Sequence, residues 1–150
     1  MRRGAGERRA RWKQVAAIFT VAVASNYLWE MAQMYYYTGA DSPRASWYCL
    51  LASLGDGLLV LLIFAAGRMV LRRRNWYEHP GVGGYLLMLV AGTAVGITVE
   101  WLAVHETGTW EYAARMPLLP GTQMGLLPVA QMLVLPPLSF RVVASLIKGS

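Results

Sequence analysis

The sequence predicts an all-α integral membrane protein, a single domain over residues 1–150 in which four transmembrane helices form a bundle. Hydrophobic residues make up 56% of the chain and charged residues only 15%, whereas a soluble domain carries about 25% charged residues. The apolar residues also gather into stretches of about 20, the length at which a helix crosses a bilayer. Four stretches have this length, at about 14–36, 46–67, 84–104 and 123–142.

The basic residues predict how these helices are oriented. Of the fourteen lysines and arginines, twelve lie on the side that holds both termini if the chain crosses four times. Because cytoplasmic segments are enriched in Lys and Arg, both termini are expected in the cytoplasm and the chain in the plasma (inner) membrane. The formal net charge of +6 is then explained without nucleic acid, whose binding needs a basic face on a water-exposed module. Apolar character that continues through Tyr36 favours an uncleaved first helix over a signal peptide.

The third and fourth stretches contain residues that shape a helix. Gly92 and Gly96 lie on one stripe of the third stretch, and small residues at this spacing let two helices pack closely in lipid. Prolines predict a kink or a short non-helical stretch in the fourth. They are Pro128, Pro136 and Pro137. Residues 105–121, between the two stretches, are expected to form the longest loop, on the outer side.

Aromatic residues near the ends of the stretches predict a belt at each membrane surface, where Trp and Tyr are enriched. Trp47 and Tyr48 are expected in the outer belt. Trp12, Trp76 and Tyr77 are expected in the inner one.

Three carboxylates lie inside the apolar stretches, where each costs several kcal/mol unless it is neutralised, paired or hydrated. Glu30, Asp56 and Glu100 belong to three different stretches, at depths of about 9, 15 and 6 Å from the outer end at 1.5 Å per residue. We therefore expect them to converge in the outer half of the bundle. At least one should be protonated at neutral pH, because burial and a nearby like charge disfavour the ionised form. A protonated acid beside an ionised one can perform acid–base catalysis, although a purely structural hydrogen-bond network is the alternative.

Amide and aromatic side chains lie near these acids in the predicted bundle. Asn26, Glu30 and Gln33 share one helix face, and Gln131 has a depth similar to that of the acids. The residues expected to line a binding cavity are Asn26, Trp29, Gln33, Trp101, Trp110, Tyr112 and Gln131.

The sequence does not favour a metal site or a covalent nucleophile. Carboxylate-bridged bundles carry Glu-x-x-His pairs, which are absent, and His105 is five residues from Glu100. A single cysteine, Cys49, excludes an internal disulfide and a Cys-based zinc cluster. We therefore expect neither metal nor cofactor.

Short motifs resemble membrane enzymes of isoprenoid metabolism. Residues 100–101 (Glu-Trp), 107–112 (Thr-Gly-Thr-Trp-Glu-Tyr) and 125–128 (Gly-Leu-Leu-Pro) resemble the small membrane domain of heterodimer-type lycopene cyclases and of carotenoid hydratases. Residues 26–30 (Asn-Tyr-Leu-Trp-Glu) are similar to the Asn-x-x-Trp-Glu helix of fungal membrane terpene cyclases, in which the Glu is regarded as a proton donor. Where the lycopene cyclases have paired acids after the proline, residues 129–131 are Val-Ala-Gln, so the resemblance does not carry that activity over. The whole chain looks more like small four-helix bacterial membrane proteins of unassigned activity.

These observations lead to two hypotheses of different classes. The first is a cofactor-independent cyclase-, isomerase- or hydratase-like enzyme, or a binding protein, for an isoprenoid or carotenoid-like membrane lipid. In it, Glu30 or Asp56 donates a proton and Glu100 orients or accepts. The alternative is a small proton-linked transporter, expected to form a homo-oligomer, or an accessory subunit of a larger membrane complex, because intramembrane acids also mark proton paths.

Overall fold

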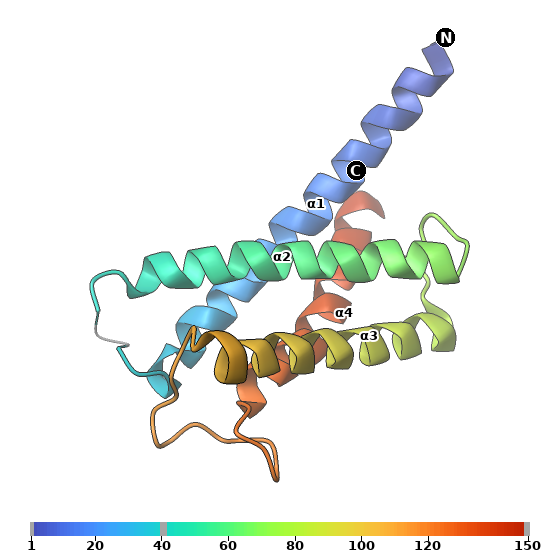
Figure 1. Ribbon diagram of the computed structural model, residues 1–150. Coiled ribbons are helices and arrows are strands. Elements are labelled where there is room, and N and C mark those ends of the chain that lie inside the picture. Colours follow the sequence, from blue (N-terminus) through green and yellow to red (C-terminus); the bar gives the residue numbers. More distant parts are fainter. Residues whose placement is uncertain (1, 40–41, 149–150) are drawn as a thin grey trace.

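The structure, a computed structural model, describes residues 2–39 and 42–148. Four long helices dominate it (Figure 1): α1 (Arg2–Gln33), α2 (Ala45–Val70), α3 (Gly81–Trp101) and α4 (Leu126–Lys148). A short 3-10 turn, η1 (Met34–Tyr36), extends α1, and a π-helical segment, η2 (Leu102–Thr107), extends α3. Within the described residues the only β structure is two isolated bridges. The predicted all-α fold with four helices is confirmed.

Each long helix contains a segment that is long and apolar enough to cross a membrane. These segments are Arg8–Tyr36, Ala45–Val70, Gly81–Thr107 and Leu126–Ile147. Large apolar side chains such as Leu58, Leu62, Val82 and Leu86 are more than half exposed, an arrangement that suits lipid and not water. The helices are therefore compatible with a multi-pass membrane protein.

The helix ends differ from the predicted stretches where polar residues continue a helix. The N-terminal part of α1, with its run of arginines, begins at Arg2 and not at residue 14, and it projects beyond the other helices (Figure 1). Arginine is a good helix former, whereas hydropathy marks only where the chain becomes apolar. The structure also continues α3 through η2 to Thr107, and α4 extends from Leu126 to Lys148 and not from 123 to 142.

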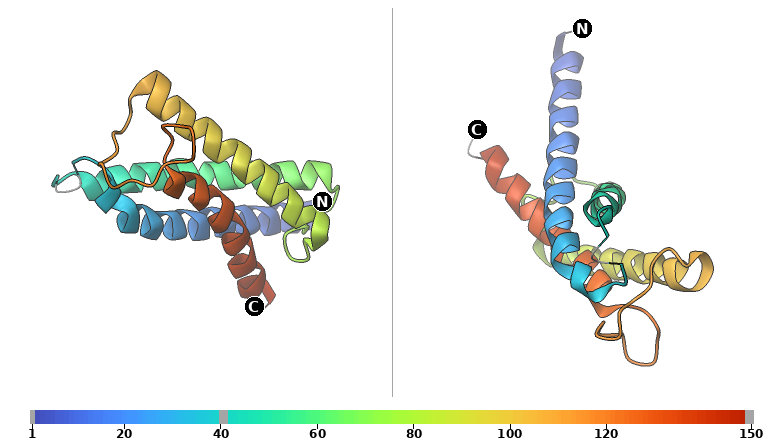
Figure 2. Two further views of the ribbon diagram at one scale, coloured as in Figure 1. Left: turned by 90° about the horizontal axis from the view of Figure 1, so that it is seen from below. Right: turned by 90° about the vertical axis from the view of Figure 1, so that its left-hand side faces the viewer.

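The prolines do not interrupt α4 within its described length. Pro128 lies in the first turn, where its missing N–H has no intrahelical acceptor to lose. Pro136 and Pro137 lie inside the helix, and Figure 2 shows the axis of α4 changing direction along its length. The structure therefore has the predicted kink and not the alternative, a non-helical stretch. Proline bends a helix because it removes one hydrogen bond and crowds the preceding turn.

A hydrophobic core lies at the end of the molecule that includes the α2–α3 loop. Its largest side chain is Trp76, which is 0% exposed and donates an indole N–H to the Phe64 carbonyl at 3.1 Å. Gly67 leaves room for this indole, since a Cβ on Gly67 would overlap it, whereas a Cβ on Gly84 would crowd Pro80. The prediction that Trp76 and Tyr77 form an interfacial belt is wrong, because the loop folds inward and buries both rings. Trp12, in contrast, is 71% exposed.

Small residues set the packing of α3 against α4. A Cβ on Gly92 would overlap the Met132 carbonyl oxygen, and one on Gly96 would press on Met132 and Val129. The predicted close packing at Gly92 and Gly96 is confirmed.

Hydrogen bonds that involve the loops lie at both ends of the molecule. At one end, Gln14 of α1 donates to Asn75 and Tyr77 of the α2–α3 loop, at 3.4 and 3.1 Å. At the other, the backbone N–H of Thr38 donates to the Glu111 carbonyl at 3.0 Å and that of Ala113 to the Tyr36 carbonyl at 2.9 Å. The second pair joins the α1–α2 loop to the segment 108–125, which together we call the outer end, after the orientation that the basic residues predict.

Candidate functional site

A cavity of about 1010 Å³ lies near the outer end, among all four helices and the segment 108–125. Glu30 of α1, Asp56 of α2 and Glu100 of α3 all line it, so the three acids converge on one space as expected. Much of the remaining wall is apolar: Met34, Ala45, Ala52, Leu59, Val99 and Met132. No lysine, arginine or histidine is among its lining residues in the described part of the chain. The acids therefore share an apolar cavity without a cation in its wall.

Gln131 of α4 lines this cavity and makes hydrogen bonds to side chains of α1 and α2. Its Nε2 donates to Asp56 Oδ2 at 2.9 Å and to Asn26 Oδ1 at 2.7 Å. Its Oε1 accepts from Gln33 Nε2 at 3.1 Å. Because Gln131 is only 2% exposed, these bonds hold one orientation of its amide. One oxygen of Asp56 is thereby occupied as an acceptor.

The predicted residues on α1 lie behind the cavity wall and support it. Asn26 is 0% exposed and donates to the Ala22 carbonyl at 2.8 Å. Trp29 donates its indole N–H to Gln33 Oε1 at 3.0 Å, which leaves the Gln33 Nε2 for Gln131. Asn26, Trp29 and Gln33 are not among the lining residues. Their geometry is that of a network that orients Gln131, in place of the predicted contact with a ligand.

Glu100 has the most unusual environment of the three acids. It is 1% exposed, and the Tyr112 hydroxyl donates to its Oε2, which also lies 3.4 Å from the Gly125 N–H. Tyr112 in turn accepts from the Gly125 N–H at 3.1 Å and from the Trp110 indole at 3.4 Å. Glu100 Oε1 is buried and has no hydrogen-bond partner among the described residues. Tyr112 thus occupies one oxygen and leaves the other free.

Tyr37 and Trp110 form an aromatic part of the cavity wall, whereas Tyr112, which was expected to line the cavity, is not among the lining residues. Tyr37 packs against Tyr112 and Trp110, with ring centroids 5.5 and 6.5 Å apart. Burial, with the nearby Glu100 and Glu30, holds the pKa of Tyr37 well above its ordinary value. Burial and the hydrogen bond to Glu100 likewise raise the pKa of Tyr112. Both phenols therefore remain neutral hydrogen-bond donors at physiological pH.

Sequence reasoning missed Tyr37. It follows the predicted first stretch directly, and it lies seven residues after Glu30 and three after Met34. This spacing predicts one face of a continuous helix; in the structure Tyr37 has an extended backbone directly after η1, and all three residues line the cavity. Extending the periodicity by one residue would have identified it.

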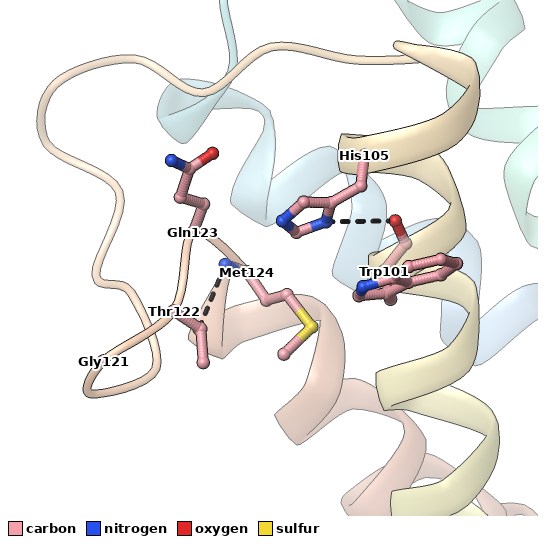
Figure 3. A pocket seen from close by; sticks show the side chains of 6 residues that line it. All are labelled: Trp101, His105, Gly121, Thr122, Gln123 and Met124. Atoms are coloured by element: carbon pink, nitrogen blue, oxygen red, sulfur yellow. Dashed lines mark hydrogen bonds between the residues drawn. The ribbon is translucent and has the colours of Figure 1, made fainter.

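The structure places Trp101 elsewhere, contrary to the expectation that it lines the cavity. Figure 3 shows Trp101 beside a second hollow, of about 470 Å³, with His105 and residues 121–124. The indole is 46% exposed and stacks on the His105 ring at 5.8 Å, and His105 Nδ1 lies 3.2 Å from the Trp101 carbonyl oxygen. Successive residues of a helix differ by about 100° in direction, so a buried Glu100 turns Trp101 away from the cavity.

The described residues contain no group of three His, Cys, Asp or Glu side chains arranged to hold a metal ion. Cys49 lines the cavity and is 5% exposed.

Comparison of the chain with protein-family models, curated proteins and solved structures gave no match. The site is therefore interpreted from its own geometry.

Proposed function

We propose that this protein is a membrane-embedded acid–base enzyme, or a binding protein, for an isoprenoid-like lipid. The observation that carries the proposal is the buried Oε1 of Glu100, which has no partner in the described part of the chain, at an apolar cavity that Glu30 and Asp56 also line. A network that only held helices together would be expected to satisfy its buried polar atoms, since each unsatisfied one is costly. An unsatisfied carboxyl oxygen beside an apolar cavity is consistent with a partner supplied by a ligand.

The cavity suits a large apolar molecule. Small-molecule sites commonly measure about 300–1,000 Å³ and combine apolar walls with a few polar groups, and the volume of about 1010 Å³ lies at the upper end of this range. Four acids line the cavity, Glu111 together with the three helical ones, and no cation does so among the described residues, so the wall would repel an anionic group such as a diphosphate. A neutral lipid meets both conditions, because it is apolar and carries no negative charge. Carbon–carbon double bonds in this lipid would give the acids a group to protonate.

Acid–base chemistry on such a lipid needs only the side chains present. A protonated Glu30 or Asp56 transfers its proton to one carbon of a double bond, whose π electrons form the new C–H bond and leave a carbocation on the adjacent carbon. Glu100 Oε1 then removes a proton from a neighbouring carbon, and the electrons of that C–H bond form a new double bond. One proton is given and one is taken, so the oxidation state of the lipid is unchanged and no cofactor is required. After the product leaves, exchange with water removes the proton from Glu100 and returns one to the donor acid.

Neighbouring groups would support each step. The Gln131 amide holds Asp56 Oδ2 at 2.9 Å, which leaves Oδ1 to carry the proton. Tyr37 and Trp110 line the cavity, and aromatic faces stabilise a nearby cation by about 0.5–2 kcal/mol. Apolar walls exclude the water that would capture the cation, so rearrangement is favoured over hydration.

Deuterium transfer tests this proposal on a mixture of candidate lipids. Membranes that contain the protein are incubated in D₂O with an isoprenoid lipid extract, and mass spectrometry measures deuterium in non-exchangeable C–H positions. Glu30→Gln, Asp56→Asn and Glu100→Gln should each reduce incorporation to background. Glu106→Gln, at an exposed position outside the cavity, should retain it. Wild-type incorporation in all three cavity variants would refute the chemistry.

We also propose that both termini face the cytoplasm of a plasma (inner) membrane, with the cavity in the outer half of a single transmembrane domain. Support comes from the basic residues, because Arg8, Arg9 and Arg11 are exposed at the α1 end opposite the outer end, and such residues favour the cytoplasmic side. Green fluorescent protein fused to either terminus should fluoresce, whereas alkaline phosphatase fused there should be inactive. The reverse pattern would overturn this orientation.

A proton-linked transporter is the second candidate, and the same acids favour it. Three carboxyls from three helices around one cavity could pass protons across part of the membrane. Purified protein in liposomes distinguishes the two candidates, because a transporter would acidify the lumen under an imposed potential and an enzyme would not.

A further inference from the structure

The wall of the cavity is incomplete on the side between α2 and α3. Figure 2 shows α3 running at an angle to α2, so that the two helices diverge toward the outer end. Leu51 and Gly55 of α2 line the cavity, yet both are exposed, Leu51 by 48%. A Cβ added to Gly55 would meet no atom within 4 Å. Open space therefore continues from the cavity past Gly55 to the surface.

A second glycine of α2, Gly57, has no open space beside it, so the open space is confined to the surroundings of Gly55. Gly57 is buried, and a Cβ added to it would crowd the side chains of Val23 and Phe19 of α1. Gly57 thus serves helix packing, which is the common use of small residues in membranes. Gly55 packs against nothing, so packing does not explain the absence of a side chain there.

The opening lies at the depth of hydrocarbon. Gly55 is ten residues from Ala45, the first residue of α2, or about 15 Å along a helix axis, and the apolar core of a bilayer is about 30 Å thick. The side chains beside it on the outer surface, Leu54 and Leu58, are 38% and 61% exposed. Bilayer chains, and not water or headgroups, would surround an opening at this depth.

We infer that the opening at Gly55 is a lateral portal through which a hydrocarbon chain passes from the bilayer into the cavity. The absence of a side chain at Gly55 leaves room for the chain, and the neighbouring Asp56 is the first acid that it reaches. The inference rests on the proposed function only in taking the occupant to be a lipid. It adds the route of access and assigns Gly55 and Leu51 as the residues that limit it.

Photocrosslinking with a neutral probe, a fatty alcohol that carries a mid-chain diazirine, tests the portal. The protein is placed in phosphatidylcholine nanodiscs with this probe, illuminated, and mapped by mass spectrometry. Met132, 4% exposed and lining the cavity, reports the interior, and Leu62, 58% exposed, reports the lipid-facing surface. In the wild type, both positions should be labelled.

Filling the opening should change only the interior label. Gly55→Leu should reduce labelling at Met132 by about tenfold, because the added side chain and the probe chain together would overpack the opening. Labelling at Leu62 should be unchanged. Leu51→Phe should act in the same direction, and Met69→Phe, which adds bulk to the same helix at a 76% exposed position away from the cavity, should match the wild type.

Two outcomes would overturn the inference, and they are distinguishable. Equal labelling of Met132 in the wild type, Gly55→Leu and Leu51→Phe would refute the portal and leave a lipid-binding cavity. No labelling of Met132 in the wild type would refute lipid occupancy, and with it both the portal and the proposed function. The melting temperature of Gly55→Leu should stay at or above the wild-type value, because the new side chain meets open space.

Discussion

Replacing Gln131 with leucine should destabilise the outer half of the bundle by an amount that follows from its contacts. The amide makes hydrogen bonds to Asn26, Gln33 and Asp56, and leucine has a similar volume, so little cavity forms. Interhelical hydrogen bonds in membrane proteins average about 0.6 kcal/mol. Loss of three should lower the free energy of unfolding by about 2 kcal/mol, or about 30-fold in the unfolding equilibrium.

Reversible unfolding in mixed micelles, followed by tryptophan fluorescence during titration with sodium dodecyl sulfate, measures this difference. Val134→Leu is the matched control, because Val134 lies on the same helix and is 48% exposed. It should unfold at the wild-type midpoint. If Gln131→Leu were as stable as the wild type, the network around Gln131 would not be holding α1, α2 and α4 together, and its role in orienting Asp56 would lose its basis.

Three further predictions follow from the packing and from the tyrosines. Gly92→Leu should lower the free energy of unfolding by about 1–3 kcal/mol, because its side chain would meet the Met132 carbonyl; an unchanged unfolding midpoint would contradict the packing of α3 on α4. Trp76→Ala should cost about 3–5 kcal/mol in the same titration, whereas a cost below about 1 kcal/mol would mean that this buried ring is not a core residue. Burial raises the pKa of Tyr37 and Tyr112 above the ordinary 10.0, so their contribution to stability is complete below about pH 10 and is lost above it, as the unfolded tyrosines ionise first. Midpoints measured between about pH 8 and pH 11 should fall with pH less steeply in the double Tyr→Phe variant, and identical slopes would argue against buried phenols.

Sequence reasoning was most successful where a property depends on residues close together in the chain. Apolar stretches and the fixed rise of a helix predicted four helices and the similar depths of Glu30, Asp56 and Glu100. The spacing of Gly92 and Gly96 predicted close packing on one stripe. Each of these inferences uses only the geometry of a single helix, which tertiary contacts do not change.

Sequence reasoning failed where the answer depends on how two segments meet. Trp76 and Trp101 have the same amphipathic ring, yet the first is buried by a loop that folds inward and the second points away from the cavity. Hydropathy could not separate them, because it measures transfer of a residue from water to lipid and not the direction in which its side chain points.

The arrangement of the site itself came from the packing of the helices against one another. That Gln131 joins Asn26 to Asp56, that Tyr112 leaves Glu100 Oε1 without a partner, and that Gly55 borders an opening all depend on the rotation and crossing of separate helices. The amino-acid pattern specifies which residues lie at each depth. Interhelical packing selects which of them face each other, because contacts across helices are made by side chains far apart in the chain.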